Sequence, residues 1–461
     1  MKMSSCLTGL LASSLLLGCS LTSTEIPTSE RQVGEATAPK NIIFMIGDGM
    51  GANYLTAYRY YLATEPSAEV AATIFDELWL GISSTYPADN TFVTDSAASA
   101  TALATGVKTF NGAIAVDQQH LPIGTMMQLA KRLGKANGIV ASSQVNHATP
   151  AGFLAHNPSR RNYDAIADMY LDYRVDGQIV ADVILGGGTE YFIREDRNLV
   201  AEFKANGYQY ADNWQDLAQL TQKPALALLA EKGLPSALNN PEPRPLARLT
   251  EKALKLLAPN EQGFLLMVEG SQIDWCGHAN DIACAMAEMA DFAEAVAVAK
   301  HFVDQHPDTL LVITADHETG GLSIGADGIY AWLPQVIMQV QMTAAALAEE
   351  LQALNSAAAF YQRWMELTAI ELPEDVQASL FAARTLDRRA FRFALTEQIN
   401  RASHTGWTTT GHTAADVPVL AYGKWQQDFA GFQDNTDIAR QLMQYVLRYA
   451  GKNDDNIIST D

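Results

Sequence analysis

Short apolar runs alternate along the chain with segments whose apolar residues recur at helical spacing. Runs that lack polar alternation are typical of strands covered on both faces. The six clearest runs span residues 41–46, 138–141, 182–185, 264–268, 310–314 and 417–421. Strands that alternate with helices predict an α/β fold, in which a mostly parallel central sheet is flanked by helices on both faces.

Two segments depart from this alternation and are predicted to be insertions in a single domain of residues 39–452. Residues 195–260 mix Ala, Leu and Pro with charged residues, which predicts helices and loops that flank the sheet. Residues 330–400 are predicted to be mostly helical, with an Ala-rich stretch at 344–359. The sequence shows no internal repeat, and no apolar run after the N-terminus is long enough to cross a bilayer as a helix.

The N-terminus has the features of a bacterial export signal. Lys2 supplies a positive charge, and the apolar stretch from Leu7 to Leu17 is too short for a membrane-spanning helix. Residues 16–19, Leu-Leu-Gly-Cys, resemble the lipobox of bacterial lipoproteins, which is cut before the cysteine and acylated on it. We therefore expect a signal peptide at 1–18, lipidation of Cys19 and a flexible tether at 19–38. The chain would then be exported and held in the periplasm or at the outer membrane. The alternative is an ordinary signal peptide cleaved nearby, with Cys19 incidental.

The charge balance limits the partners of the chain. It carries 31 basic and 52 acidic side chains, a net charge of -21. Because binding to nucleic acid needs clustered Lys and Arg, we expect no nucleic-acid-binding surface. The negative electrostatic field of such a chain also repels anionic substrates. An anion would therefore need a strongly positive local site, such as bound metal ions.

Processing and lipidation of the N-terminus would leave Cys276 and Cys284 of the four cysteines. Residues eight apart on one continuous helix lie about 12 Å from each other, which is too far for a disulfide. A non-helical segment would allow them to bridge, but we expect no disulfide.

Polar residues gather just after the predicted strands. They are Asp48 after the first run, His147 and Thr149 after the second, Glu269 and Asp274 after the fourth, and Asp316 and His317 after the fifth. Ligands of open α/β sheets bind at the carboxyl ends of the strands. We therefore predict one site assembled from many loops.

Several of these residues have the types and spacing of metal ligands. Asp274 and His278 are four residues apart, which places them on one face of a helical turn or in a tight loop. Asp48 lies between two glycines, which let a ligand approach closely, and His412 lies in a polar loop before a strand. This mix of oxygen and nitrogen ligands suits a catalytic zinc site.

Simpler interpretations exist for the individual motifs. An isolated pair such as Asp316 and His317 after a strand is more often a surface turn. Residues 47–51 could be mistaken for a dinucleotide-binding loop, but Asp48 would repel a pyrophosphate and the G-x-G-x-x-G spacing is missing. The number of such residues after separate strands favours the metal site.

Ser96 is the candidate nucleophile. Small helix formers follow it, so it is predicted to lie at a helix N-terminus, where free amides and the helix dipole favour phosphate oxygens. The simpler interpretation is that Asp95 and Ser96 only cap the helix.

Six segments, in order along the chain, closely resemble motifs of the alkaline phosphatase family. They are residues 41–51, 93–112, 147–150, 269–278, 314–318 and 411–413. The resemblance implies an alkaline-phosphatase-like fold and a site that holds two Zn²⁺ and one Mg²⁺. It also implies broad specificity for small phosphate monoesters, which are hydrolysed through a phosphoserine intermediate to release inorganic phosphate.

The family pattern implies a role for each matching residue. Ser96 matches the nucleophile, and Arg160 matches the side chain that clamps the phosphate, where a planar guanidinium can bind two oxygens. The implied ligands are Asp274, His278 and His412 for the first zinc, Asp48, Asp316 and His317 for the second, and Asp48, Thr149 and Glu269 for the magnesium.

Two positions differ from the enterobacterial form of the family. His147 stands where that form has Asp, and Trp275 stands where it has Lys. Histidine and tryptophan at these two positions resemble the marine bacterial branch of the family. Both positions lie near the third metal implied by the resemblance, so the identity and occupancy of that metal are open. The insertion at 330–400 is also shorter than the loop with which some marine members clasp a partner subunit, so a homodimer is left open.

Three other classes of protein fit the sequence less well. A sulfatase needs Pro and Arg soon after its nucleophile, and neither follows Ser96. A nucleotide phosphodiesterase of the same superfamily usually has a Thr nucleophile and lacks an arginine that matches Arg160. A non-catalytic phosphate- or metal-binding lipoprotein would not need the serine.

Overall fold

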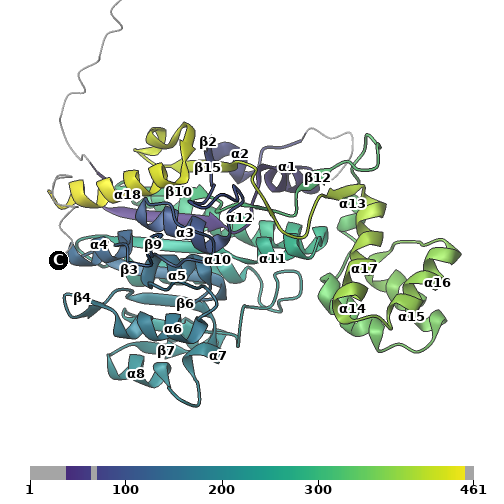
Figure 1. Ribbon diagram of the computed structural model, residues 1–461, viewed down its shortest axis with the longest axis horizontal. Coiled ribbons are helices and arrows are strands. Elements are labelled where there is room, and N and C mark those ends of the chain that lie inside the picture. Colours follow the sequence, from purple (N-terminus) through teal and green to yellow (C-terminus); the bar gives the residue numbers. More distant parts are fainter. Residues whose placement is uncertain (1–37, 64–69, 452–461) are drawn as a thin grey trace, which may run out of the picture. The chain divides into compact units, whose positions relative to one another are not determined.

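A ten-stranded sheet runs through residues 38–63 and 70–451, the part of the chain that the computed structural model describes (Figure 1). The strand order is β16-β2-β15-β10-β1-β9-β3-β6-β8-β7. In that order the strands are Gly431–Asp434, Trp79–Ser84, Val417–Tyr422, Thr309–Thr314, Asn41–Gly47, Phe264–Gly270, Ala136–Gln144, Val183–Gly187, Ala225–Leu228 and Gln209–Ala211. Neighbouring strands pair in parallel, except that β15 is antiparallel to both β10 and β2. The predicted mostly parallel sheet is confirmed.

All six predicted strands are present, but the sheet has four more. The additional strands β2, β7, β8 and β16 are three to six residues long. Two of them, β7 and β8, lie within residues 195–260, so this segment extends the sheet and is not only helices and loops. Such short runs are hard to distinguish from loops, because their stability comes from the neighbouring strand.

Side chains alternate between the two faces along each strand, and each face packs on its own helices. Ile43 and Met45 of β1 belong to one core, and Ile42 and Phe44 belong to the other. The first core includes α1 (Ala52–Tyr61), α2 (Ile74–Leu78), α9 (Trp214–Gln219), α10 (Pro245–Leu257), α11 (Gln272–His278) and α12 (Ile282–Gln305). The second includes α3 (Ser96–Thr105), α4 (Met126–Arg132), α5 (Ala148–Leu154), α6 (Tyr163–Asp172), α7 (Thr189–Phe192), α8 (Leu199–Ala205) and α18 (Asn435–Tyr449).

Residues 330–400 are mostly helical, as predicted. The helices are α13 (Pro334–Ile337), α14 (Ala344–Gln352), α15 (Ala357–Thr368), α16 (Glu374–Ala383) and α17 (Arg388–Ser403). They pack against one another around the buried side chains of Phe360, Trp364 and Phe391 (Figure 1, green).

Strand direction brings the predicted site residues to one edge of the sheet. The parallel strands β1, β3, β9 and β10 all end at this edge, and antiparallel β15 begins there. The segment before β15 is fixed by a two-residue pairing of β14 (His412–Thr413) with β11 (Glu318–Thr319). Loops from five strands therefore meet at one place.

The expectation of no disulfide is wrong, because Cys276 and Cys284 are bonded to each other. They do not share a continuous helix: Cys276 lies in α11 and Cys284 in α12, and the chain turns between them. Asn280 in this turn has a left-handed backbone with φ 50°. The turn brings the two Cα atoms to 5.5 Å, within the range of a disulfide.

The predicted signal peptide, the lipidation site at Cys19 and the tether up to residue 37 lie outside the described residues. Among residues 38–63 and 70–451, the helices lack the combination of length and apolar content that a membrane span requires.

Candidate active site

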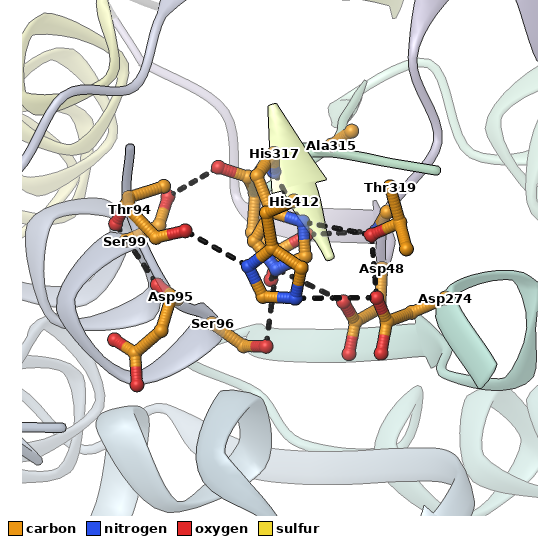
Figure 2. Close-up of polar contacts among 12 residues, drawn as sticks. Asp48, Thr94, Asp95, Ser96, Ser99, Asp274, Ala315, His317, Thr319 and His412 are labelled. Atoms are coloured by element: carbon orange, nitrogen blue, oxygen red, sulfur yellow. Dashed lines mark hydrogen bonds and ion pairs between the residues drawn. The ribbon is translucent and has the colours of Figure 1, made fainter. Parts of the chain in front are cut away.

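Ser96 is the first residue of α3, and its hydroxyl points towards a cluster of imidazoles and carboxylates (Figure 2). Asp95 is the N-cap, and its Oδ1 accepts hydrogen bonds from the backbone amides of Ala98 and Gly112, both at 3.0 Å. Ser96 therefore lies in the first helical turn, where backbone amides have no intrahelical acceptor. Its Oγ is 3.1 Å from Nε2 of His317. The predicted position of Ser96 at a helix N-terminus is confirmed.

Asp274 and His278 lie on one face of α11 and meet His412. Oδ1 of Asp274 is 3.4 Å from Nε2 of His278 and 3.5 Å from Nε2 of His412, and the two Nε2 atoms are 3.1 Å apart. The Nδ1 atoms of His278 and His412 donate to the carbonyl oxygens of Thr410 and Thr94, at 2.6 and 2.9 Å. A neutral ring that donates from Nδ1 has a lone pair on Nε2. Two lone pairs and a carboxylate oxygen thus converge, as the ligands of a cation do.

A second cluster consists of Asp48, Asp316 and His317, which are fully buried. Nε2 of His317 lies 3.5 Å from Oδ1 of Asp48 and 3.2 Å from Oδ2 of Asp316. Burial and the neighbouring carboxylates raise the pKa of Asp48 well above its usual value, and burial raises the pKa of Asp316 to about 8. Burial also lowers the pKa of His317. A bound cation would instead lower the pKa of the two carboxyl groups and so favour their ionised form.

A third cluster shares Asp48 and adds Glu269 and His147, whose ligand atoms lie within 4.8 Å of one another. Burial raises the pKa of Glu269 to about 7 and lowers the pKa of His147 to about 3. Thr149, in the first turn of α5, is buried and approaches Glu269. From the sequence, His147 was expected beside the third metal. The structure places its ring within the group of ligand atoms, next to the edge of Trp275 at 6.0 Å between ring centroids.

Arg160 joins the helix of Ser96 to the third cluster. One guanidinium nitrogen, Nη1, is 3.1 Å from Oδ2 of Asp95, and the other, Nη2, is 3.3 Å from Nε2 of His147. The backbone amide of Arg160 donates to the carbonyl of Gly112 at 2.8 Å. The guanidinium is therefore held between His147 and Asp95, the residue that precedes Ser96.

Unpaired carboxylate oxygens test whether these clusters fit metal ions. Within the described chain, both side-chain oxygens of Asp48, Oε1 of Glu269 and Oδ2 of Asp316 are buried without a hydrogen-bond donor. Burying an unpaired carboxylate costs several kcal/mol, at least about 3 by mutational data. Cations at the clusters would pair these oxygens, and the mix of carboxylate and imidazole suits zinc and other divalent ions. The residues fit metal ions.

Two further residues of the site were missed in the sequence. The hydroxyl of Thr319 lies 2.5 Å from Oδ1 of Asp274 and 3.3 Å from Nδ1 of His317, so it links two clusters (Figure 2). Asp95 was interpreted only as a helix cap, although it also binds Arg160. Neither contact has a signal in the sequence, because the partners are 45 and 65 residues away.

The structure brings together all the predicted site residues that it describes. The set comprises Asp48, Ser96, His147, Thr149, Arg160, Glu269, Asp274, Trp275, His278, Asp316, His317 and His412.

The sequence of this chain is similar to those of known proteins. Residues 39–449 match the family model described as alkaline phosphatase. Alkaline phosphatase 3 of Bacillus subtilis is 43% identical over 434 residues, which cover 93% of this chain and 94% of that protein.

Solved structures of alkaline phosphatases are similar as well. The cold-active enzyme of a psychrophilic Shewanella is 47% identical, with a TM-score of 0.83 over 88% of this chain and 99% of that one. A variant of the enzyme from the Antarctic bacterium TAB5, in which a histidine is replaced by aspartate, is described with Mg bound in its M3 site. It is 26% identical, with a TM-score of 0.66 over 91% of this chain and 100% of that one.

Proposed function

The chain belongs to the alkaline phosphatase family, and from this premise we propose that it hydrolyses a broad range of phosphate monoesters through a phosphoseryl intermediate on Ser96. It is a metal-dependent phosphomonoesterase. The observation that supports the intermediate is the position of the Ser96 hydroxyl. It lies in the first turn of α3, 3.1 Å from His317 and beside carboxylates that need a cation.

We assign two zinc ions and one magnesium ion to the three clusters. The ligands would be Asp274, His278 and His412 for the first zinc, Asp48, Asp316 and His317 for the second, and Asp48, Thr149 and Glu269 for the magnesium. The unpaired oxygens of Asp48, shared by two clusters, support this assignment. When bound, the cations supply positive charge that stabilises negative oxygens of the serine, the phosphate and the leaving group.

The side chains of this protein have distinct roles in the reaction. The Ser96 Oγ attacks phosphorus in line, so that an O–P bond forms as the bond to the leaving alcohol breaks, and the alcohol takes up a proton. Water then attacks the phosphoserine, which releases phosphate and regenerates the hydroxyl. Arg160 binds two non-bridging oxygens with its planar guanidinium, which Asp95 holds in place. The amides of Ser96 and Ala97, the first two of α3, would face the same oxygens, whereas the amide of Ala98 donates to Asp95.

Hydrolysis of p-nitrophenyl phosphate and bis-p-nitrophenyl phosphate from pH 6 to 11 tests the proposal. The wild type and Ser96→Ala are compared with and without a chelator. We expect strong monoester turnover at alkaline pH, reduced at least about a hundredfold by Ser96→Ala and abolished by the chelator. Phosphate labelling of the wild type, quenched in acid, should mark the peptide that contains Ser96.

Two other outcomes of this assay would indicate a different function. Preference for the diester would indicate a phosphodiesterase of the same superfamily. Bound zinc without turnover would indicate a phosphate- or metal-binding protein.

We also propose that the chain is exported and anchored to the membrane by lipid on Cys19. The support is the lipobox-like sequence at residues 16–19. Separation of a cell extract into a detergent phase and an aqueous phase tests this. The wild type should partition into the detergent phase, and Cys19→Ser should appear in the aqueous phase. Light scattering of the mature chain would test whether it forms a homodimer.

A further inference from the structure

The position of His278 depends on the turn that follows it. His278 is the last residue of α11, and its side chain is 40% exposed, whereas that of Asp274 is 5% exposed. Outside the cluster its ring is held by the hydrogen bond from Nδ1 to Thr410. Because neighbouring groups cover only part of this side chain, the position of the ring also depends on the C-terminal end of α11.

The turn between α11 and α12 is tied down at several points. The amide of Asp281 donates to the carbonyl of Cys276 at 3.0 Å, which closes the turn onto α11. The Asp281 carboxylate accepts from the amide of Cys284 at 3.1 Å and from that of Ala344, in α14, at 2.6 Å. Asp281 therefore caps α12 and joins it to the helices of residues 330–400.

The disulfide adds a covalent tie on the opposite side of α11 from the metal cluster. Cys276 is two residues from Asp274 and two from His278, and each residue of a helix turns by about 100°. Its side chain therefore points away from the face that carries both ligands, into the core, where 1% of Cys276 and 8% of Cys284 is exposed. The helix is held between the cluster on one face and the disulfide on the other.

We propose that the Cys276–Cys284 disulfide positions Asp274 and His278 for metal binding, and that its reduction weakens the metal site they form with His412. The proposal rests on the metal assignment of the proposed function. A dithiol supplies two electrons and two protons, the S–S bond breaks, two thiols form and the dithiol becomes a disulfide. Without the disulfide the turn samples more conformations. Metal binding must then order Asp274 and His278, which the disulfide otherwise holds in place beforehand, and this ordering weakens the binding.

Release of zinc from the zinc-loaded protein to a chromogenic chelator tests the proposal. The samples are the wild type, the wild type reduced by a dithiol that is then removed, and the double variant Cys276→Ser with Cys284→Ser. Loss of groups that orient metal ligands typically costs about 10–100-fold in affinity. We expect one zinc ion to leave about tenfold faster from the reduced protein and from the double variant, while the other leaves at the wild-type rate.

The controls separate positioning from general damage. The double variant treated with the same dithiol shows whether the reagent itself strips zinc. Circular dichroism checks the fold, and the reduced wild type still gives the result if the variant does not fold. Equal acceleration for both zinc ions would indicate a merely structural disulfide and would overturn the proposal.

Three other outcomes would also contradict it. If zinc-loaded wild type and reduced protein release zinc at the same rates, the positioning role is wrong and the metal assignment stands. Uptake of additional zinc on reduction would mean that the thiols form a site of their own with Glu288, whose ligand atom lies near both sulfurs. A wild type that binds no zinc would overturn the proposed function as well.

Discussion

Asp95 performs two tasks with one carboxylate. Oδ1 caps α3 through the amide of Ala98, and Oδ2 binds the guanidinium of Arg160. The two tasks can be separated by substitution, since asparagine caps a helix about as well as aspartate but carries no charge.

We expect Asp95→Asn to keep the stability of the wild type and to raise KM for p-nitrophenyl phosphate about three- to tenfold, because Arg160 loses its fixed orientation. Asp95→Ala should raise KM similarly and also lower the free energy of unfolding by about 1 kcal/mol. Steady-state kinetics and urea unfolding measure the two effects. An unchanged KM in both variants would show that Asp95 does not orient Arg160.

His147 belongs to the third cluster, and Trp275 packs against its ring. The ring of His147 offers a neutral nitrogen beside Asp48 and Glu269, because burial lowers its pKa to about 3. A carboxylate at this position favours Mg²⁺, which prefers oxygen ligands.

We therefore expect His147→Asp combined with Trp275→Lys to increase the activation of the enzyme by added magnesium. Activity is measured against magnesium concentration after removal of loosely bound ions, with the wild type as control. Activation equal to that of the wild type would contradict the assignment of this cluster.

At the scale of elements, α12 holds the loop between β8 and α10 through the buried side chain of Glu288. Oε1 of Glu288 accepts from the amide of Ala237 at 2.7 Å, and burial raises the pKa of Glu288 to about 7. Its ordinary value is 4.5. Between these two pH values the folded chain binds more protons than the unfolded chain, so stability decreases as the pH rises from about 4.5 to 7.

We expect Glu288→Gln to remove this contribution, because glutamine still accepts from Ala237 but does not ionise. Above pH 8 the variant should be more stable than the wild type by about 1–3 kcal/mol, with a smaller difference at pH 5. Urea unfolding at both pH values measures this. Glu371→Gln, at an exposed position, is the control and should show no such dependence. Parallel pH profiles of Glu288→Gln and the wild type would contradict the prediction.

At the scale of the whole molecule, the proposed metal ligands come from distant parts of the chain. The second and third clusters join residues that follow β1, β3 and β10 with Glu269, which lies in β9, and these four strands are at the centre of the sheet. A ligand at a thousand times its Kd stabilises the folded state by about 4 kcal/mol.

We expect a chelator to lower the thermal unfolding temperature by at least about 5 °C and excess zinc with magnesium to restore it. Calorimetry with and without the chelator measures the change. An unchanged unfolding temperature despite removal of the metals, verified by elemental analysis, would contradict the role of the clusters in stability.

The sequence by itself determined the features that depend on near neighbours. Apolar runs identified β1, β3, β6, β9, β10 and β15, and small residues after Asp95 identified the start of α3. The four-residue spacing of Asp274 and His278 predicted one face of a helical turn or a tight loop, and the first of these is what the structure has. The family resemblance supplied the remaining site residues in order along the chain.

Only the tertiary structure decided the features that depend on the path of the chain. The turn at Asn280 made the disulfide feasible, and pairing with β6 made a strand of β8. The contact of Thr319 with Asp274 and the position of His147 among the ligands also required the folded chain. The physical reason is range: strands and helix caps depend on residues a few positions apart, whereas these contacts depend on distant segments that meet only after the sheet has formed.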